Sequence, residues 1–287
     1  MSPAPEAIPV SPDRYELGEG PLWDAERQRL LWVDILAGKV FAGRLDPFEV
    51  TDTWEFDGVA TAVAVAADGA LLVAERETLT RVDPDGARTH VARVLPAGCG
   101  SRLNDGAVDP TGRFLVGSMA LDDRTGAELL VRLEGGGCAT IDSDLTLSNG
   151  LAWAPDGNAL YSIDSTARKV RVRDYPGGER RDLLEVTGGL PDGMCADSDG
   201  NLWIAVHGAG RVECRSPGGT LFGVIELSAP QPTSVSFAGP DLDVLVITTA
   251  TENMSAEELA KHPDSGRVFT ARVGATGLPT PYWNPAL

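Results

Sequence analysis

Four residues with oxygen-bearing side chains stand close before a glycine: Glu19, Asn104, Asn149 and Asp192. Glycine follows each of them directly, except that Asp105 intervenes before Gly106. A glycine at this place lets the backbone turn sharply and approach a small ion closely. Carboxylate and amide oxygens are the donors that Ca²⁺ and Mg²⁺ prefer, and Mn²⁺ or Zn²⁺ also accept them. If the four side chains converge, they form a site for one divalent cation.

The spacing of these residues indicates a repeat that would bring them together. Turns ending in glycine recur at intervals of 43, 45 and 43 residues, at Gly69, Gly112, Gly157 and Gly200. The residues eight positions earlier are, in order, Thr61, Asn104, Asn149 and Asp192. Weaker copies of the turn put Glu19 and Thr233 in the same phase. Because such a repeat sets equivalent positions on a ring around one axis, we expect Glu19, Asn104, Asn149 and Asp192 to meet there.

The elements that position these residues read as short strands. Each repeat contains apolar runs of four to six residues bounded by Gly, Pro or Asp, for example Ala62–Ala66 and Leu71–Ala74. A period of about 40–50 residues is typical of propellers and solenoids. The sequence therefore predicts an all-β fold, a six-bladed β-propeller with four-stranded antiparallel blades around a central channel. Its inner strands should open near Gly20, Ala62, Gly106, Gly150, Gly193 and Ser234.

The two ends of the repeat region have their own predicted roles. Glu6 to Tyr15 should pair with Arg267–Thr270 in the last blade, which closes the ring and protects its edge. Only Ser255–Lys261 looks helical, with Ser255 as N-cap and Glu258 completing a capping box. We see no linker or low-complexity tract, so we expect a single propeller domain spanning residues 1–287.

Bulk composition narrows the class of protein. The net charge of −18, from 42 acidic and 24 basic residues, argues against nucleic acid or an anionic membrane as partner. Met1–Val10 has no signal-peptide pattern, and no stretch approaches the ~20 apolar residues of a membrane span. The four cysteines should be buried free thiols, with a Cys195–Cys214 disulfide as the alternative. We expect a cytoplasmic monomer or weak dimer that binds a small molecule.

Longer motifs around the same residues show a family resemblance. They are Leu17–Trp23 (LGEGPLW), Arg102–Gly106 (RLNDG), Ser148–Trp153 (SNGLAW) and Pro191–Gly193 (PDG). With these motifs the chain resembles the family of senescence marker protein 30 (regucalcin), gluconolactonases and related sugar lactonases, from about Leu17 to Trp283. The resemblance implies a six-bladed propeller with one catalytic divalent cation in the channel. Ca²⁺ is the first choice, and Zn²⁺, Mn²⁺, Mg²⁺ and Fe²⁺ are alternatives.

Residue roles follow from the resemblance motif by motif. Glu19, Asn149 and Asp192 are the implied metal ligands, and Asp192 is also the general base. Asn104 is either a fourth ligand or a substrate contact. Arg102 reaches oxygens of the substrate, unless it forms a salt bridge with a neighbour such as Asp105. We expect Asp105 itself to orient Arg102 or Asn104.

One position departs from the family pattern. After Gly117–Met119 some animal members carry a substrate-facing glutamate in a lid loop, where this chain has Leu121–Asp123. Asp122 aligns with that glutamate but is one methylene shorter. We expect Asp122 to contact the substrate.

These inferences combine into one functional hypothesis. A lactone is an internal ester, and its hydrolysis needs a polarised carbonyl, a nucleophilic water and stabilised charge, all of which a divalent cation can supply. The predicted protein is a metal-dependent sugar lactonase that hydrolyses an aldonolactone of the glucono-, xylono-, arabinono- or galactonolactone type to the acid. Two alternatives stay open: a calcium-dependent propeller resembling organophosphate hydrolases, and a non-catalytic calcium-binding propeller. A Gly-x-Ser-x-Gly elbow and nucleotide-binding glycine loops are missing from the sequence.

Overall fold

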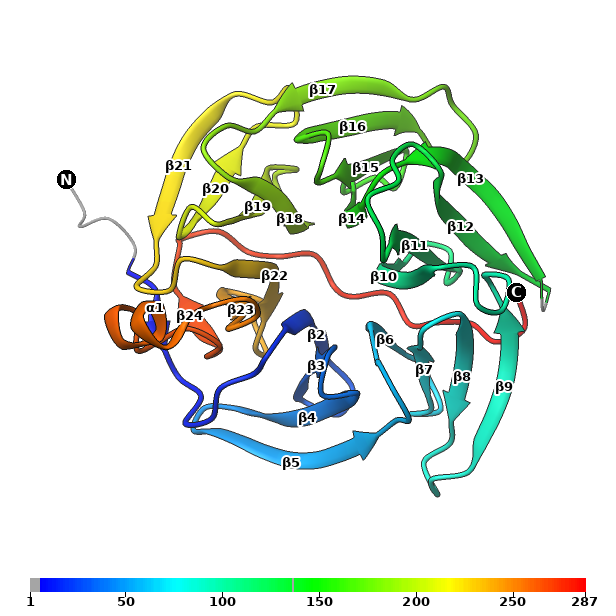
Figure 1. The fold of residues 1–287 in the computed structure, drawn as a ribbon, viewed down its shortest axis with the longest axis horizontal. Coiled ribbons are helices and arrows are strands. Elements are labelled where there is room, and N and C mark those ends of the chain that lie inside the picture. Colours follow the sequence, from blue (N-terminus) through cyan, green and yellow to red (C-terminus); the bar gives the residue numbers. More distant parts are fainter. Residues whose placement is uncertain (1–5, 136) are drawn as a thin grey trace.

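A ring of six four-stranded antiparallel sheets surrounds a central channel in the computed structural model (Figure 1). The structure describes residues 6–135 and 137–287. The prediction of an all-β, six-bladed propeller is therefore confirmed. Residues 1–5 and residue 136 lie outside the described residues. The first of these belong to Met1–Val10, where no signal-peptide pattern was found, and both fall within the expected 1–287 domain.

Five blades are built from four consecutive strands, ordered outward from the channel. Blade one contains β2 (Gly18–Asp24), β3 (Arg29–Asp34), β4 (Lys39–Leu45) and β5 (Phe48–Glu55), and blade two contains β6 (Ala62–Val65), β7 (Leu71–Ala74), β8 (Thr78–Val82) and β9 (Arg88–Arg93). Blade three contains β10 (Ser101–Val108), β11 (Phe114–Ala120), β12 (Glu128–Glu134) and β13 (Gly137–Leu145), and blade four contains β14 (Ser148–Trp153), β15 (Ala159–Asp164), β16 (Lys169–Asp174) and β17 (Arg181–Glu185). Blade five contains β18 (Leu190–Ala196), β19 (Leu202–His207), β20 (Arg211–Arg215) and β21 (Leu221–Glu226).

Blade six closes the ring with strands from both ends of the chain. Its order is β22 (Pro232–Ala238), β23 (Val244–Thr249), β24 (Phe269–Ala271) and β1 (Ile8–Pro9). Ile8 lies opposite Thr270 and Pro9 opposite Phe269 in an antiparallel pair. The predicted closure by the N-terminal segment is confirmed. It covers the edge of β24, which would otherwise present unpaired backbone groups.

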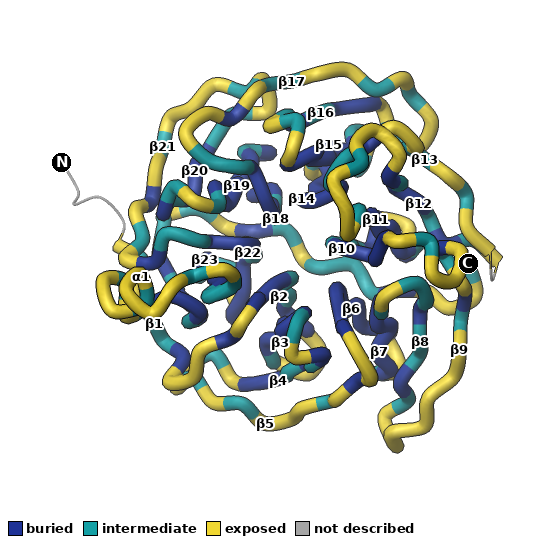
Figure 2. The backbone as a smooth tube through the Cα atoms, in the orientation of Figure 1, coloured by how far each residue is buried: buried dark blue, intermediate teal, exposed yellow. Residues whose placement is uncertain are grey.

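Burial falls from the channel outward, as Figure 2 shows for all blades. The inner strand β6 and its neighbour β7 are buried throughout, whereas the outer strands β9 and β13 are largely exposed. Because inner strands are tightly surrounded, small residues such as Ala62 and Ala64 suit them. Larger apolar side chains fill the spaces between blades, and they include the buried tryptophans Trp23, Trp32, Trp153 and Trp203.

The one predicted helix is present as α1 (Ala256–Lys261), in the connection between β23 and β24. Ser255 is its N-cap, and Ser255 and Glu258 form the predicted capping box. Within residues 6–135 and 137–287, no helix combines the length and apolar character that a membrane crossing requires.

All four cysteines are free thiols, but their burial differs from the expectation. Only Cys214 is buried, Cys99 and Cys195 are partly exposed, and Cys138 is exposed. Cys195 and Cys214 both lie opposite Trp203, on the two strands that flank β19. A whole strand therefore separates them, which explains why no disulfide forms.

A C-terminal strap, residues 276–284, crosses the ring and was not predicted from the sequence. Figure 1 shows this red segment running across the centre. Backbone hydrogen bonds fix it to four blades: Ser198 N to Thr276 O, Gly277 N to Leu242 O, Trp283 N to Val65 O and Asn284 N to Gly112 O. The Tyr282 hydroxyl donates to Asp24 Oδ1 (2.9 Å) in a fifth blade. The strap therefore spans one end of the channel.

Candidate metal centre

The predicted ligands lie where inner strands lose their regular register. The shifts fall between Glu19 and Leu22 in β2, Leu103 and Gly106 in β10, Asn149 and Leu151 in β14, and Pro191 and Met194 in β18. A β-bulge bends a strand and redirects a side chain. In blade two, β6 pairs with β7 in regular register. Blade six has the same shift, between Pro232 and Ser234 around Thr233, so the irregularity accompanies every inner strand except that of blade two.

Two of the glycines after the predicted ligands, Gly150 and Gly193, are required by crowding between blades. A Cβ on Gly150 would lie 2.5 Å from the Asp192 carbonyl oxygen, and one on Gly193 would lie 2.1 Å from Ser234 Oγ. Both distances are far below normal contact, so neither position accepts a side chain. At Gly150 and Gly193 the structure therefore shows that glycine lets adjacent inner strands approach. At Gly20 the positive φ of 53°, with no atom within 4 Å of a Cβ, agrees with the predicted sharp turn.

Hydrogen bonds connect the amide ligands across blades three, four and five. Asn149 Nδ2 donates to Asp192 Oδ1 and to Ser165 Oγ (3.1 Å). Asn104 Nδ2 donates to the Ser148 carbonyl oxygen (3.0 Å). Both Nδ2 groups are therefore committed to the protein. The Oδ1 atom of Asn149, which accepts only a 3.3 Å contact from Gly150 N, keeps lone-pair capacity for a cation.

Arg102 is buried beside Asn104. Its Nη1 donates to Asn104 Oδ1 (2.8 Å) and to the Leu103 carbonyl oxygen (2.9 Å). Burial lowers the pKa of Arg102 to about 10, opposed by the negative charges of Glu252 and Glu19. Arg102 has no salt bridge within the part of the chain that the structure describes. The contacts of Arg102 therefore do not favour the alternative that it forms a salt bridge with Asp105.

Two buried carboxylates face the same space. Glu19, Asn104, Asn149 and Asp192 are each between 5% and 9% exposed. Burial raises the pKa of Glu19 well above its ordinary value, and the charges of Asp192 and Asp105 raise it further. Burial likewise raises the pKa of Asp192, followed by the charge of Asp105, against the hydrogen bond from Asn149. Mutual repulsion of this kind is relieved when a cation is shared.

The donor set fits a hard divalent cation. Among the described residues, no group of three or more His, Cys, Asp or Glu side chains is arranged to hold a metal. A cation in this channel would therefore be shared between carboxylate and amide oxygens, which suits Ca²⁺ better than a thiolate or imidazole metal. Glu19, Asn149 and Asp192 would hold the cation. Asn104 lies beside Asn149, because its Nδ2 donates to the carbonyl oxygen of Ser148, and its Oδ1 accepts from Arg102.

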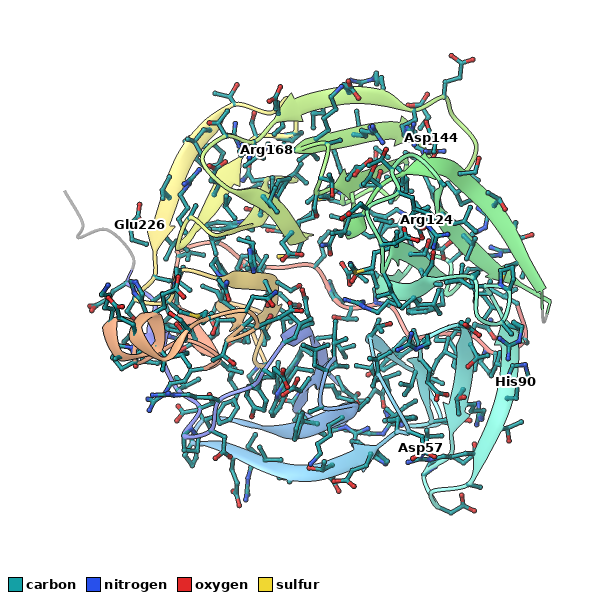
Figure 3. The ribbon with its side chains drawn as sticks, viewed as in Figure 1. Asp57, His90, Arg124, Asp144, Arg168 and Glu226 are labelled. Carbon is teal, nitrogen blue, oxygen red and sulfur yellow. The ribbon has the colours of Figure 1, made fainter. Side chains whose placement is uncertain are left out.

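Two other predicted residues take different positions. Asp122 is exposed in the β11–β12 loop, where its carboxylate accepts from Arg124 N (3.1 Å) and pairs with Arg124 Nε (3.4 Å). Arg124, labelled in Figure 3, also donates to Ser101 Oγ (2.7 Å). Asp105 accepts from Gly106 N (2.7 Å), while Arg102 and Asn104 orient each other. The expected orienting role of Asp105 therefore belongs to Asn104 and Leu103.

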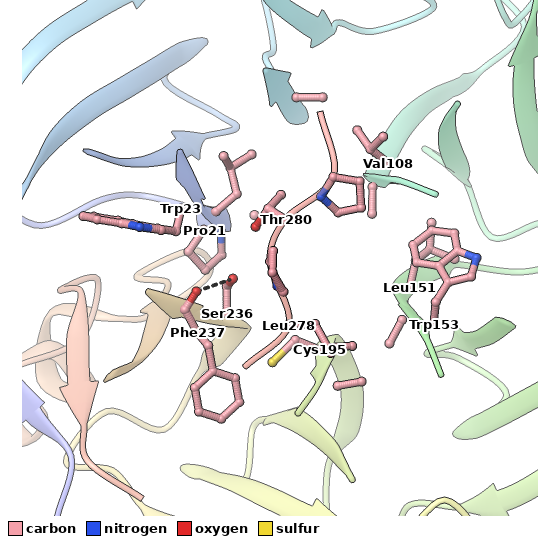
Figure 4. Close-up of a pocket in the computed structure, with 18 of the residues that line it drawn as sticks. Pro21, Trp23, Val108, Leu151, Trp153, Cys195, Ser236, Phe237, Leu278 and Thr280 are labelled. Carbon is pink, nitrogen blue, oxygen red and sulfur yellow. Dashed lines mark hydrogen bonds between the residues drawn. The ribbon is translucent and has the colours of Figure 1, made fainter. Parts of the chain in front are cut away.

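A cavity of about 390 Å³ lies below the candidate centre. It begins at Gly20 and Asp105, beside the predicted ligands, and ends at the strap residues Leu278–Tyr282. Figure 4 shows Leu278 and Thr280 crossing this space between Pro21 and Leu151. Its walls are mainly apolar, and the strap crosses the lower channel there.

Sequence reasoning noted Thr233 in the ring phase but gave it no role. Its Oγ1 donates to the Gly18 carbonyl oxygen (2.5 Å) and contacts Thr248 Oγ1 (2.9 Å). Gly18 immediately precedes Glu19, so blade six supports the backbone that carries this carboxylate. The repeat phase that Thr233 shares with the four predicted ligands is the sequence signal that could have revealed this supporting role.

Comparison with known proteins agrees with the geometry. A family model described as SMP-30/Gluconolactonase/LRE-like region matches residues 17–251. The chain is 39% identical to 6-deoxy-6-sulfogluconolactonase of Pseudomonas putida, over 92% of this chain and 94% of that protein. It is 33% identical to regucalcin of Xenopus laevis, over 91% and 92%. A solved luciferin-regenerating enzyme superposes with TM-score 0.91 at 27% identity, covering 98% and 100%. The chain therefore belongs to the SMP-30/gluconolactonase/LRE-like family.

Proposed function

We propose that this protein is a lactonase that hydrolyses a sugar lactone with the help of one divalent cation. Glu19, Asn149 and Asp192 hold the cation, and Asn104 is a fourth ligand or a substrate contact. The observation that carries the proposal is the contact between Asn149 and Asp192, buried beside Glu19 at the mouth of the channel. The lactonase and regucalcin names of its relatives support the choice of reaction.

The reaction uses few protein groups. A divalent cation held by Glu19, Asn149 and Asp192 would polarise the ester carbonyl and lower the pKa of a nearby water. Asp192 accepts the proton of the water that adds to the carbonyl carbon. The ring C–O bond then breaks, and the ring oxygen leaves as a hydroxyl after taking up a proton. Arg102, held by Asn104, donates hydrogen bonds to substrate oxygens.

The two ends of the channel differ in their lining. The strap crosses the lower channel, which is lined mainly by apolar side chains, so we expect polar substrates to enter from the ligand side. The polar groups around Asp192 are buried, and in such surroundings of low dielectric constant charges interact more strongly than in water. Both features favour hydrolysis of a small polar ester over binding of a large partner.

A lactone panel tests the function. The chain is stripped with a chelator, dialysed, and assayed on glucono-, xylono-, arabinono- and galactonolactone with Ca²⁺, Mg²⁺, Mn²⁺, Zn²⁺ or Fe²⁺ added singly. We expect hydrolysis to return with at least one cation. Asp192→Asn should lower kcat about 10²–10⁴-fold, as loss of a general base does. The control Asp199→Asn changes an exposed aspartate of the same blade and should retain full activity.

The alternatives are decided in the same assay. Greater kcat/KM on a fluorophosphate than on every lactone would favour the organophosphate-hydrolase alternative. Cation binding without hydrolysis of either class would favour a non-catalytic propeller. Full lactonase activity in Asp192→Asn, or in the chelated protein, would contradict the proposed mechanism.

A further inference from the structure

A tight turn at the end of blade six presents one carboxylate that the mechanism does not use. Met254 N donates to Thr251 O (3.1 Å), and Asn253 adopts a positive φ of 60°. These features make a four-residue turn with Glu252 as its first central residue. A non-glycine residue with positive φ is uncommon and persists where the surroundings demand it. The turn is therefore a specified shape rather than a loose loop.

The backbone of Glu252 is fixed to the mouth of the channel. Thr251 N and Glu252 N both donate to Glu16 O (2.9 Å each). Ala250 forms a bridge with Leu17, two residues before Glu19, and Ala250 N donates to Gln231 O (3.0 Å). Blades one and six thus hold the turn at the end of the ring where the ligand Glu19 lies.

The carboxylate of Glu252 itself is uncommitted. It is half-buried, and within the described residues it has no hydrogen bond or ion pair. Its charge is nevertheless felt by two residues on other blades. It is the strongest of the negative charges that oppose the lowering of the Arg102 pKa, and it contributes to the raised pKa of Asp192. The geometry agrees with this, because the turn is held to Glu16 and Leu17 at the end of the ring that carries Glu19, and blade six stands opposite blade three in the ring.

Donors and acceptors now stand on opposite sides of the channel mouth. Arg102, from blade three, has only N–H donors, and the carboxylate of Glu252, from blade six, has only acceptors. A hydroxyl group both donates and accepts, so a neutral ring carrying several hydroxyls can satisfy both sides at once. A half-buried carboxylate with no partner gains most from such hydroxyl donors.

We propose that Glu252 binds hydroxyl groups of the substrate and so makes the enzyme favour polyhydroxylated lactones over lactones without hydroxyl groups. The inference rests on the proposed lactonase function. It adds a substrate-facing carboxylate from blade six to the one that the sequence predicts at Asp122, whose Oδ1 accepts from Arg124 N.

Two lactones that differ in hydroxyl groups test the proposal. D-Glucono-1,5-lactone carries ring hydroxyls, and δ-valerolactone has none. We expect Glu252→Ala to lower kcat/KM on gluconolactone about 10- to 100-fold, mainly through KM, as loss of hydrogen bonds to a charged group does. The valerolactone value should change less than twofold. The kcat/KM of Glu252→Gln on gluconolactone should lie between those of wild type and Glu252→Ala. Glu257→Gln, which changes an exposed residue on α1, should behave as wild type.

A binding measurement separates this proposal from the proposed function. The cation-loaded protein is titrated with 1,5-anhydro-D-glucitol, a neutral ring polyol that cannot be hydrolysed. Glu252→Ala should weaken its binding about tenfold or more, with unchanged cation affinity and unfolding temperature. If wild type opens neither lactone, the lactonase function is wrong, and the titration alone decides the role of Glu252. Equal losses on both lactones, or unchanged polyol binding, would overturn the proposal.

Discussion

Asn149 and Asp192, which are 43 residues apart, are hydrogen-bonded across two neighbouring blades. The same number separates the turn glycines Gly157 and Gly200 of those blades. One repeat of sequence is therefore one step around the ring. Asn104, which contacts the Ser148 carbonyl oxygen 44 residues away, makes the preceding step. Residues in one repeat phase become neighbours because the inner strands pack side by side.

Removing the Asp192 charge should stabilise the cation-free protein while abolishing its response to cations. The pKa of Asp192 is raised in the folded state by burial and by Asp105. Charging this carboxyl thus opposes folding, and the cation-free protein loses stability as pH rises through the raised pKa. Asp192→Asn should raise Tm at neutral pH, by about 2–4 °C for each 1 kcal/mol of unfavourable charge burial that the substitution removes.

Calorimetry with and without chelator measures both effects. A cation at about 100 times its Kd should add about 2.7 kcal/mol of stability to wild type and almost nothing to Asp192→Asn. Asp199→Asn, exposed in the same blade, should respond as wild type does. A lower Tm of chelated Asp192→Asn than of chelated wild type would contradict the electrostatic account.

Thr233→Val should weaken cation binding without touching a ligand. The substitution removes the hydrogen bond that Thr233 donates to Gly18 O, next to Glu19. Loss of such supporting contacts typically costs about 10–100-fold in metal affinity. Thr61→Val is the matched control, because Thr61 occupies the same phase and bonds Ala74 O (3.3 Å) within its own blade. Isothermal titration should show weaker binding only for Thr233→Val, and equal effects would count against the positioning role.

Asp109 should contribute stability that is lost in acid. Burial raises its pKa, but hydrogen bonds from the Tyr175 hydroxyl (2.6 Å), Thr111 and Arg113 outweigh burial, and the net shift is downward. A lowered folded-state pKa gives stability that is present above the ordinary carboxyl pKa and disappears as pH falls through the lowered value.

Urea unfolding at two pH values checks the Asp109 prediction. Asp109→Asn should cost about 1–3 kcal/mol at pH 7 and much less near pH 2. Tyr175→Phe, which removes one of the donors, should cost a smaller amount with the same pH trend. A cost for Asp109→Asn that does not change with pH would assign its role to packing instead.

Trp283 should anchor the C-terminal strap. The side chain is 4% exposed and packs in the core between blades two and three, and its backbone pairs beside Ala66. Trp283→Ala should therefore cost about 3–5 kcal/mol in denaturant unfolding, as large buried aromatic deletions do. Tyr282→Phe, which removes only the hydrogen bond to Asp24, should cost about 1 kcal/mol. If Trp283→Ala lowered the free energy of unfolding by less than Tyr282→Phe does, the strap would not be needed for the stability of the ring.

Much of the architecture follows from the sequence. The glycine intervals gave six blades, and the phase selected Glu19, Asn104, Asn149 and Asp192, whose contacts the structure now describes. The closing strand and the capping box at Ser255 were also predicted correctly. These features are readable because each depends on a local pattern that repeats or on a few adjacent residues.

Other features depend on contacts between segments that no repeat relates. The strap lies against five blades, Thr233 meets Gly18 from 215 residues away, and Glu252 is placed by Glu16. The contact of Asp122 with Arg124 in the β11–β12 loop was likewise not readable from the sequence, and its expected contact with the substrate stays a prediction. Sequence alone determined the blade count and the oxygen-rich set of residues, because strand periodicity is local. The tertiary structure alone decided which end of the channel the strap crosses and which side chains line the cavity there, because those follow from how distant segments pack.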